Sequence, residues 1–137
     1  MSASETRKWL EYAQSDLDAA RTLLAAEDHF LRQDCYLAQQ SAEKALKAAL
    51  IAQKLEFPFT HDLDRLRNLL SEQWTVKSTF PDLAELTIWA VEARYPADMP
   101  EVLERDARRA IELARDIVRL IEGDLPAFSA PEHPDPH

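Results

Sequence analysis

Glycine is almost absent from this chain of 137 residues. Its single glycine is Gly123, close to the C-terminal end. Loops that cradle phosphate with backbone N–H groups need several glycines at fixed spacing. A glycine-rich phosphate loop is therefore excluded.

Cysteine and long apolar segments are also scarce. Cys35 is the only cysteine, so no intramolecular disulfide can form, which fits a reducing compartment. No apolar run approaches the roughly 20 residues that span a bilayer. Residues 1–8 lack the apolar core of a signal peptide. We therefore expect a cytoplasmic protein that does not contact a membrane.

Patterns that bind metal are missing as well. The four histidines are scattered and accompany one cysteine, which is not typical of a zinc site. No Glu-x-x-His pair of the kind found in di-iron bundles is present. We therefore expect no metal site and no cofactor.

Helix-forming residues dominate what remains. Hydrophobic residues make up 46% and charged residues 30% of the chain, a globular balance rich in Ala, Leu, Glu, Arg and Lys. Apolar residues at helical spacing and capping residues, including Thr60 for the third helix, predict helices over about 4–26, 33–54, 60–72, 81–93 and 98–122. The pattern favours an all-α fold, an antiparallel up-and-down helical bundle of about five helices with a four-helix core.

The C-terminal end of the chain has a different composition. Gly123 is a natural stop for the last helix. Four prolines follow after Leu125, at positions 126, 131, 134 and 136. We therefore expect one domain over residues 1–125 and a disordered proline-rich tail over 126–137.

Acidic residues outnumber basic ones. The chain has 25 Asp and Glu against 16 Lys and Arg, a net charge of −9. This balance disfavours nonspecific coating of nucleic acid, because phosphate backbones repel an acidic protein. A local basic stripe for RNA is one reading of the last predicted helix; we favour a solvated exterior laced with carboxylates. The arginines concerned are Arg105, Arg108, Arg115 and Arg119.

Three segments of the chain form a recognisable set: Tyr36-Leu37-Ala38-Gln39-Gln40-Ser41-Ala42-Glu43-Lys44-Ala45-Leu46-Lys47-Ala48, Thr60-His61-Asp62-Leu63 and Ala93-Arg94-Tyr95-Pro96. Together they resemble the HEPN family (higher eukaryotes and prokaryotes nucleotide-binding domain). Their order and spacing also match, and the resemblance covers about Lys8 to Glu122. It implies a helical bundle that usually dimerises. Many such proteins accompany a minimal nucleotidyltransferase, often in toxin–antitoxin pairs, and others are metal-independent ribonucleases.

The ribonuclease members of this family carry Arg, four to six residues and then His. None of the four histidines here has an arginine at those offsets; His61, for example, has Lys54, Leu55 and Glu56 there. We therefore expect no ribonuclease activity, or very weak activity. The alternative is a divergent ribonuclease with His61 as the base and Arg94 as the cation that stabilises the phosphorane.

Candidate ligand-binding residues lie mainly on one face of the second predicted helix. Tyr36, Gln40, Glu43 and Lys47 follow one another at i, i+4, i+7 and i+11. They form either a polar wall for a nucleotide, with Lys47 at phosphate, or a solvated face. We favour the solvated face, with an exposed Glu43–Lys47 pair that contributes a few tenths of a kcal/mol. The full set of candidates is Tyr36, Gln40, Glu43, Lys44, Lys47, His61, Arg94 and Tyr95.

The three candidates outside that helix also have structural interpretations. His61 at the start of a helix is typical of a local hydrogen-bonding residue. Arg94 and Tyr95 precede a proline at a helix end, where C-terminal capping and packing of the ring explain them as well as ligand binding does.

The apolar surface supports self-association. Leu50 and Ile51 fall near the polar stripe of the second helix, and Ile88 and Val91 fall off the apolar line of the fourth. A symmetric dimer would bury them. Together with this apolar surface, the resemblance to the HEPN family implies a dimeric module, non-catalytic or weakly catalytic, that binds a nucleotide and pairs with a minimal nucleotidyltransferase. The ribonuclease and a purely structural helical dimer stay as alternatives.

Overall fold

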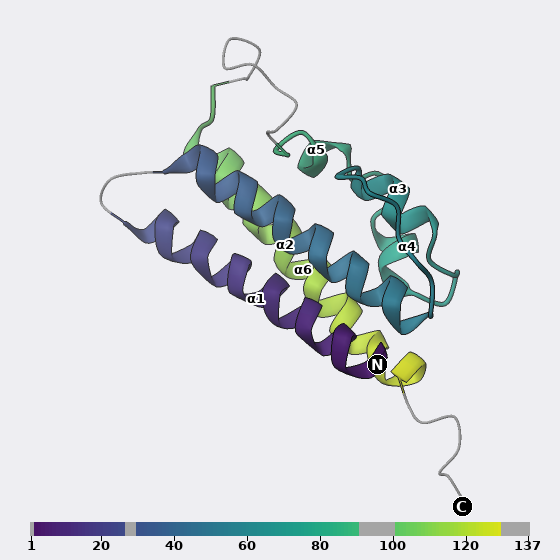
Figure 1. Cartoon of the computed structure of the whole chain (residues 1–137). Coiled ribbons are helices and arrows are strands. Elements are labelled where there is room, and N and C mark those ends of the chain that lie inside the picture. The colour runs from purple at the N-terminus through teal and green to yellow at the C-terminus, as the bar shows by residue number, and fades with distance from the viewer. Residues whose placement is uncertain (1, 27–29, 91–100, 130–137) are drawn as a thin grey trace, which may run out of the picture.

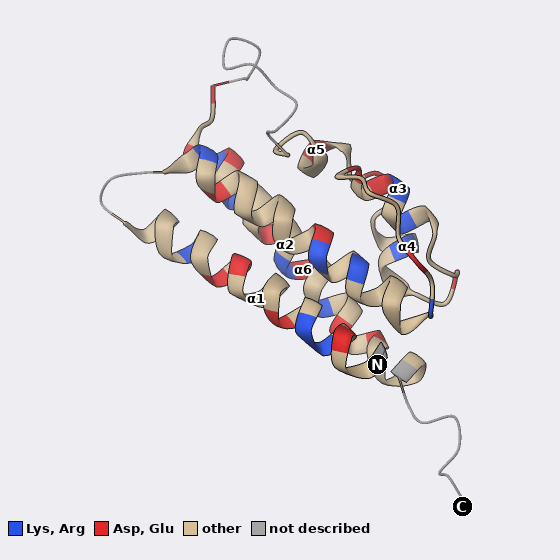
Figure 2. Cartoon of the chain, viewed as in Figure 1, with Lys and Arg blue, Asp and Glu red and all other residues tan. Residues whose placement is uncertain are grey.

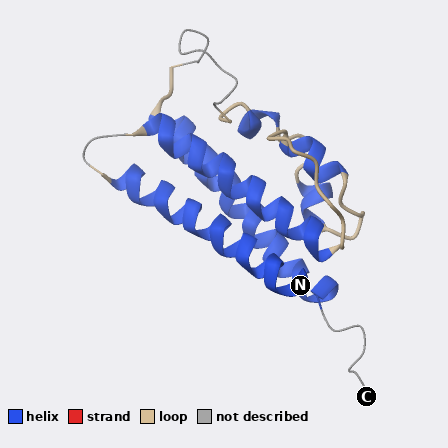
Figure 3. Ribbon diagram, in the orientation of Figure 1, coloured by secondary structure: helices blue, strands red, loops and turns tan. Residues whose placement is uncertain are grey.

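The computed structural model describes residues 2–26, 30–90 and 101–129 (Figure 1). Within these ranges the regular secondary structure is entirely helical, with no strand (Figure 3). The predicted all-α fold is confirmed. No helix in this part of the chain is long and apolar enough to cross a membrane.

Three long helices pack against one another: α1 (Ser2–Ala25), α2 (Leu31–Ala52) and α6 (Glu104–Ser129). α2 returns antiparallel to α1, and α6 runs alongside α2 in the same direction (Figure 1). Between α2 and α6 the chain passes back along the bundle through three short helices, α3 (Leu63–Asn68), α4 (Thr75–Thr79) and α5 (Ala84–Thr87). The up-and-down topology is therefore kept, and its third pass is a chain of short helices.

The alanines of α2 explain its central position. Ala38, Ala42, Ala45 and Ala49 are fully buried, and small side chains let helices approach closely. The Ser41 hydroxyl donates to the Ala13 carbonyl of α1 over 2.7 Å, and the Lys44 ammonium contacts the Asp16 carboxylate at 2.6 Å. These contacts fix the register of α1 on α2.

The short third pass differs from the two helices predicted there. Asp62, not Thr60, caps α3: its carboxylate accepts hydrogen bonds from the backbone N–H groups of Asp64 and Arg65. α3 ends at Asn68 rather than about Glu72, and the Lys77 ammonium accounts for this by binding the carbonyls of Leu70 at 2.6 Å and Asn68 at 3.4 Å. α4 was not predicted.

A buried arginine makes the turn that leads to α5. The Arg67 guanidinium contacts the Asp64 carboxylate and donates to the Phe80 carbonyl at 2.9 Å. The same carboxylate accepts from the Leu83 backbone N–H at 2.8 Å. Because these bonds satisfy backbone groups at residues 80–83, the predicted helix does not begin at Pro81, and α5 spans only Ala84–Thr87.

The last helix starts and ends later than predicted. α6 begins at Glu104, where Asp106 accepts from the Leu103 backbone N–H; the predicted cap Asp98 lies outside the described residues. α6 continues through Gly123 to Ser129. Two contacts offset the roughly 1 kcal/mol that an interior glycine costs a helix. The Phe128 ring stacks on Trp74 at 4.1 Å, and the Asp124 carboxylate accepts from the Thr75 backbone N–H. Residues 126–129 of the predicted tail are therefore helical.

The residues expected to form a dimer surface have different environments. Leu50 is fully buried within the chain, so its assignment to an exposed surface was wrong. Ile51 is half-buried, and Ile88 keeps 37% of its surface exposed. Val91 lies outside the described residues. Ile88 is thus the strongest of the four as a dimer contact.

Candidate functional site

The polar face of α2 points into the molecule over about two helical turns. Only 3% of Glu43 and 9% of Lys47 is exposed to solvent, and Gln39, one turn before Glu43, is fully buried. The favoured interpretation of this face as solvated was therefore wrong. The cause is the segment 53–62, whose contacts with this face cover a helix surface that the local sequence marks as polar.

The Glu43 carboxylate is the centre of this cluster. Its Oε2 accepts from the Lys47 ammonium at 2.8 Å. Its Oε1 lies 2.9 Å from the Nδ1 atom of His61 and also accepts from the side-chain amides of Gln39 at 3.2 Å and Gln40 at 3.3 Å. Both oxygens of a buried carboxylate are thus satisfied, as a buried charge requires.

These contacts favour the charged form of Glu43 and determine which nitrogen of His61 faces it as a donor. Burial acts to raise the pKa of Glu43, but the hydrogen bonds from Lys47 and His61 outweigh it and hold that pKa below its usual value. Glu43 is therefore a carboxylate, which accepts hydrogen bonds and cannot donate. His61 must carry a proton on Nδ1 to make its contact with Oε1. Glu43 thus sets both the orientation and the tautomer of the His61 ring.

Lys47 is enclosed by aromatic rings. Its Nζ lies 5.5 Å from the centre of the Trp9 ring and 5.1 Å from that of Phe57, within the range of cation–π attraction. The two rings meet edge to face at 5.7 Å. Glu43 and these rings therefore satisfy the Lys47 charge within the protein.

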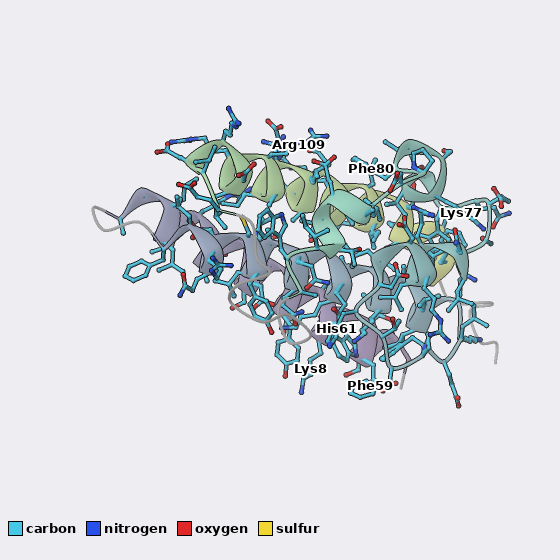
Figure 4. All side chains as sticks on the ribbon, turned by 90° about the horizontal axis from the view of Figure 1, so that it is seen from above. Lys8, Phe59, His61, Lys77, Phe80 and Arg109 are labelled. Atoms are coloured by element: carbon cyan, nitrogen blue, oxygen red, sulfur yellow. The ribbon has the colours of Figure 1, made fainter. Side chains whose placement is uncertain are left out.

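The segment between α2 and α3 carries the exposed part of the site. Gln39 donates to the His61 carbonyl at 3.1 Å, and Asp62 starts α3 directly afterwards. Phe59 is 99% exposed, and its ring centre lies 6.5 Å from that of His61. Figure 4 shows Phe59 and His61 on the same edge of the molecule as Lys8 of α1.

A shallow groove adjoins the aromatic rings. It has a volume of about 690 Å³ and lies between the beginning of α1 and the end of α2. Trp9, Ile51, Leu55 and Phe57 give it apolar walls, and Glu5, Lys54 and Glu56 complete the lining. Pockets for small molecules fall in this size range. Trp9 and Phe57 thus border both the groove and Lys47.

The structure brings only some of the predicted ligand-binding residues together. Gln40, Glu43, Lys47 and His61 form the cluster, whereas Lys44 pairs with Asp16 between α1 and α2. Tyr36 lies two turns earlier on α2 and is half-buried. Arg94 and Tyr95 fall outside the described residues, so the predicted His61–Arg94 pair stays a prediction.

Several residues of the site were not among the predicted candidates: Gln39, Trp9, Phe57 and Phe59. The sequence pattern did not single out Gln39, because Gln39 lies beside the predicted face of Tyr36, Gln40, Glu43 and Lys47 rather than on it. The aromatic residues had a signal in the Phe57-Pro58-Phe59 segment directly before Thr60-His61. Aromatic residues are enriched at surfaces where proteins bind partners.

Within residues 2–26, 30–90 and 101–129, the other reactive or charged groups do not form a second site. The Cys35 thiol is buried, and burial together with the nearby Asp106 and Asp34 raises its pKa to about 12, so it is a poor nucleophile. On α6, Arg108 pairs with Glu104, and Arg115 with Asp116, as expected for a solvated exterior. Basic and acidic residues interleave along the long helices (Figure 2). No three His, Cys, Asp or Glu side chains among the described residues gather as a metal site would require.

Comparison with known proteins agrees with this architecture. The sequence profile of the HEPN domain matches residues 6–124. The chain belongs to the HEPN domain family. Two crystal structures resemble this HEPN chain, each with 28% sequence identity over 88% of this chain and 98% of the other. They are TT1696 from Thermus thermophilus, with a TM-score of 0.75, and ST0689, an archaeal HEPN homologue, with a TM-score of 0.68. No curated protein matches the sequence.

Proposed function

We propose that this HEPN chain is a dimeric binding module for a nucleotide, held at the face formed by α1, α2 and residues 53–62. The observation that carries the proposal is the buried Glu43 carboxylate, which fixes the His61 ring beside the fully exposed Phe59. A bundle gains nothing in stability from burying a charge that apolar residues could replace. A positioned imidazole next to a bare aromatic ring suits recognition of a planar heterocycle.

The direct test is calorimetric titration with ATP. Phe59→Ala should weaken binding about 10-fold, since stacking of a base on an aromatic side chain contributes about 1–3 kcal/mol. The matched control is Phe30→Ala, because Phe30 is also exposed but lies before α2 at the other end of the bundle. Equal affinities for the two variants, or no binding of ATP by the unchanged chain, would contradict the proposal.

We further propose a minimal nucleotidyltransferase as protein partner, in a cytoplasmic toxin–antitoxin-type system. The support is membership of the HEPN family. Co-expression with the product of the neighbouring reading frame tests it: a stable complex with a small nucleotidyltransferase is expected. Recovery of the HEPN chain alone from such a co-expression would contradict this partnership.

The proposed homodimer has its own test. Sedimentation equilibrium at micromolar concentration should give twice the chain mass of 15.7 kDa. Ile88→Glu should shift the mass toward one chain, because Ile88 is an exposed apolar residue on the third pass. A mass of one chain for the unchanged protein would contradict the proposed homodimer.

A second candidate function is a metal-independent ribonuclease. The Glu43–His61 contact favours it, because a carboxylate that orients a histidine is a common arrangement for a general base. The test is cleavage of single-stranded RNA in the presence of a chelator. We expect little or no cleavage; robust cleavage that disappears in His61→Ala would establish the enzyme instead.

A further inference from the structure

The charges around the groove beside Trp9 and Phe57 do not suit a phosphate group. Glu5 and Glu56 contribute two carboxylates to its lining against the single ammonium of Lys54. The chain as a whole carries −9. A polyphosphate that approaches this groove therefore meets net repulsion.

Lys47 is another cation near this groove, and its ammonium already forms an ion pair with Glu43. Its Nζ lies 2.8 Å from Glu43 Oε2, and only 11% of its side chain is exposed. Turning the ammonium toward a phosphate would leave Glu43 buried with part of its charge uncompensated, which costs several kcal/mol. Lys47 therefore stabilises the site from within rather than binding an anion.

The walls of the groove suit the other half of a nucleotide. Trp9 and Phe57 present aromatic surface at right angles to one another, and Ile51 and Leu55 add aliphatic surface. A nucleobase gains from contact with aromatic and aliphatic side chains and carries no charge. The volume of about 690 Å³ is ample for a base with its ribose.

We infer that the groove binds the nucleoside part of the ligand and leaves its phosphates in solvent. This inference rests on the proposed nucleotide-binding function and specifies which part of the ligand is recognised. It places the base against Trp9 and Phe57 in the groove, and leaves Phe59, two residues after Phe57, as a further contact of the same ligand. Affinity should then depend on the base and change little with the number of phosphates. At low ionic strength, a nucleotide should bind slightly more weakly than its nucleoside, because its phosphates are repelled by the acidic chain.

The experiment compares four kinds of probe by calorimetry on the full chain: each of the four ribonucleosides, the matching monophosphates, the triphosphates, and inorganic tripolyphosphate. At least one nucleoside should bind within about threefold of its triphosphate, and tripolyphosphate should neither bind nor compete. Leu55→Glu, which places a charge in the groove, should abolish nucleoside binding. The control is Leu103→Glu, because Leu103 is 40% exposed against 41% for Leu55 but lies directly before α6, away from the groove lining.

The failures of the two proposals are distinguishable. A triphosphate that binds while no nucleoside does, or that still binds to Leu55→Glu but not to Phe59→Ala, would overturn the groove inference and leave the nucleotide-binding function standing. Failure of all nucleosides and nucleotides to bind would overturn both. Binding of choline, a cationic probe of aromatic sites, in place of nucleosides would also overturn the inference.

Discussion

Two ion pairs with the same spacing differ sharply in environment. Glu43 precedes Lys47 by four residues on α2, and Glu104 precedes Arg108 by four on α6. In the first pair 4% and 11% of the side chains is exposed, and in the second 46% and 64%. The i, i+4 spacing alone therefore does not determine the energy of an ion pair. The segment that packs over the pair decides whether removal of one partner costs tenths of a kcal/mol or several.

The largest effect should come from removing one partner of the buried pair. Glu43→Ala leaves the enclosed Lys47 ammonium without its carboxylate, and should lower the free energy of unfolding by about 3–5 kcal/mol. Glu104→Ala on α6 should change it by less than about 0.5 kcal/mol. Urea unfolding followed by circular dichroism measures both. Similar losses in the two variants would erase the contrast between the pairs.

Removing both partners of the buried pair should be milder than removing one. Glu43→Leu combined with Lys47→Met replaces charges by apolar side chains of similar size, and should be about 2 kcal/mol more stable than Glu43→Leu alone. The same urea series provides the measurement. A double variant as unstable as the single one would show that His61, Gln39 and Gln40, rather than Lys47, dominate the environment of Glu43.

The pH dependence of stability should separate the pairs further. The pKa of Glu43 is lower in the folded chain than in the unfolded chain, where it is about 4.3. Its contribution is therefore fully present above the unfolded value and is lost as the pH falls through the folded pKa. Between neutral pH and about pH 3, Glu43→Gln should lose less stability than the unchanged chain, whereas Glu104→Gln should follow the unchanged chain. If the free energy of unfolding fell equally with pH in the unchanged chain, Glu43→Gln and Glu104→Gln, Glu43 would not be a source of acid sensitivity.

The smallest effect belongs to the exposed pair itself. A double-mutant cycle on Glu104 and Arg108 should give a coupling energy of about 0.3–0.5 kcal/mol at low salt, and almost none at about 1 M salt. The same cycle on Glu43 and Lys47 should keep most of its coupling at high salt, since buried charges are screened much less. A coupling for Glu43 and Lys47 that salt abolishes would mean that water reaches this pair in solution.

The sequence predicted the long helices better than the region that joins them. α1, α2 and most of α6 follow from apolar residues at helical spacing and from good helix formers. The third pass does not, because side-chain hydrogen bonds set where its short helices begin and end. Asp62 caps the start of α3, and Lys77 binds a carbonyl just after its end. Arg67 and Asp64 hold the turn before α5. The bonds of Lys77, Arg67 and Asp64 to these backbone groups join residues 7, 13 and 19 positions apart, which no local pattern connects.

The sequence grouped part of the candidate cluster but not its environment. The spacing of Gln40, Glu43 and Lys47 predicted a shared face, and the structure brings these side chains together with His61. That these residues bind a ligand stays a prediction. Their burial was missed, because a polar face of a helix is normally solvated and the covering segment follows α2 in the sequence rather than belonging to it. The end of α6 was misplaced for a similar reason: Gly123 is a local stop signal, and the distant Trp74 overrides it.

The contact between Trp74 and Phe128 has a consequence for synthesis on the ribosome. α1 and α2 are consecutive, so they can pair as soon as both have left the exit tunnel. The third pass has to wait, because Trp74 is covered by Phe128, and the Thr75 N–H is bound by Asp124, 49 residues later. A nascent chain that ends before Asp124 lacks the Phe128 ring, so we expect it to expose part of Trp74, an apolar surface of the kind that makes incomplete chains prone to aggregate. Completion of the last helix covers that surface and closes the bundle.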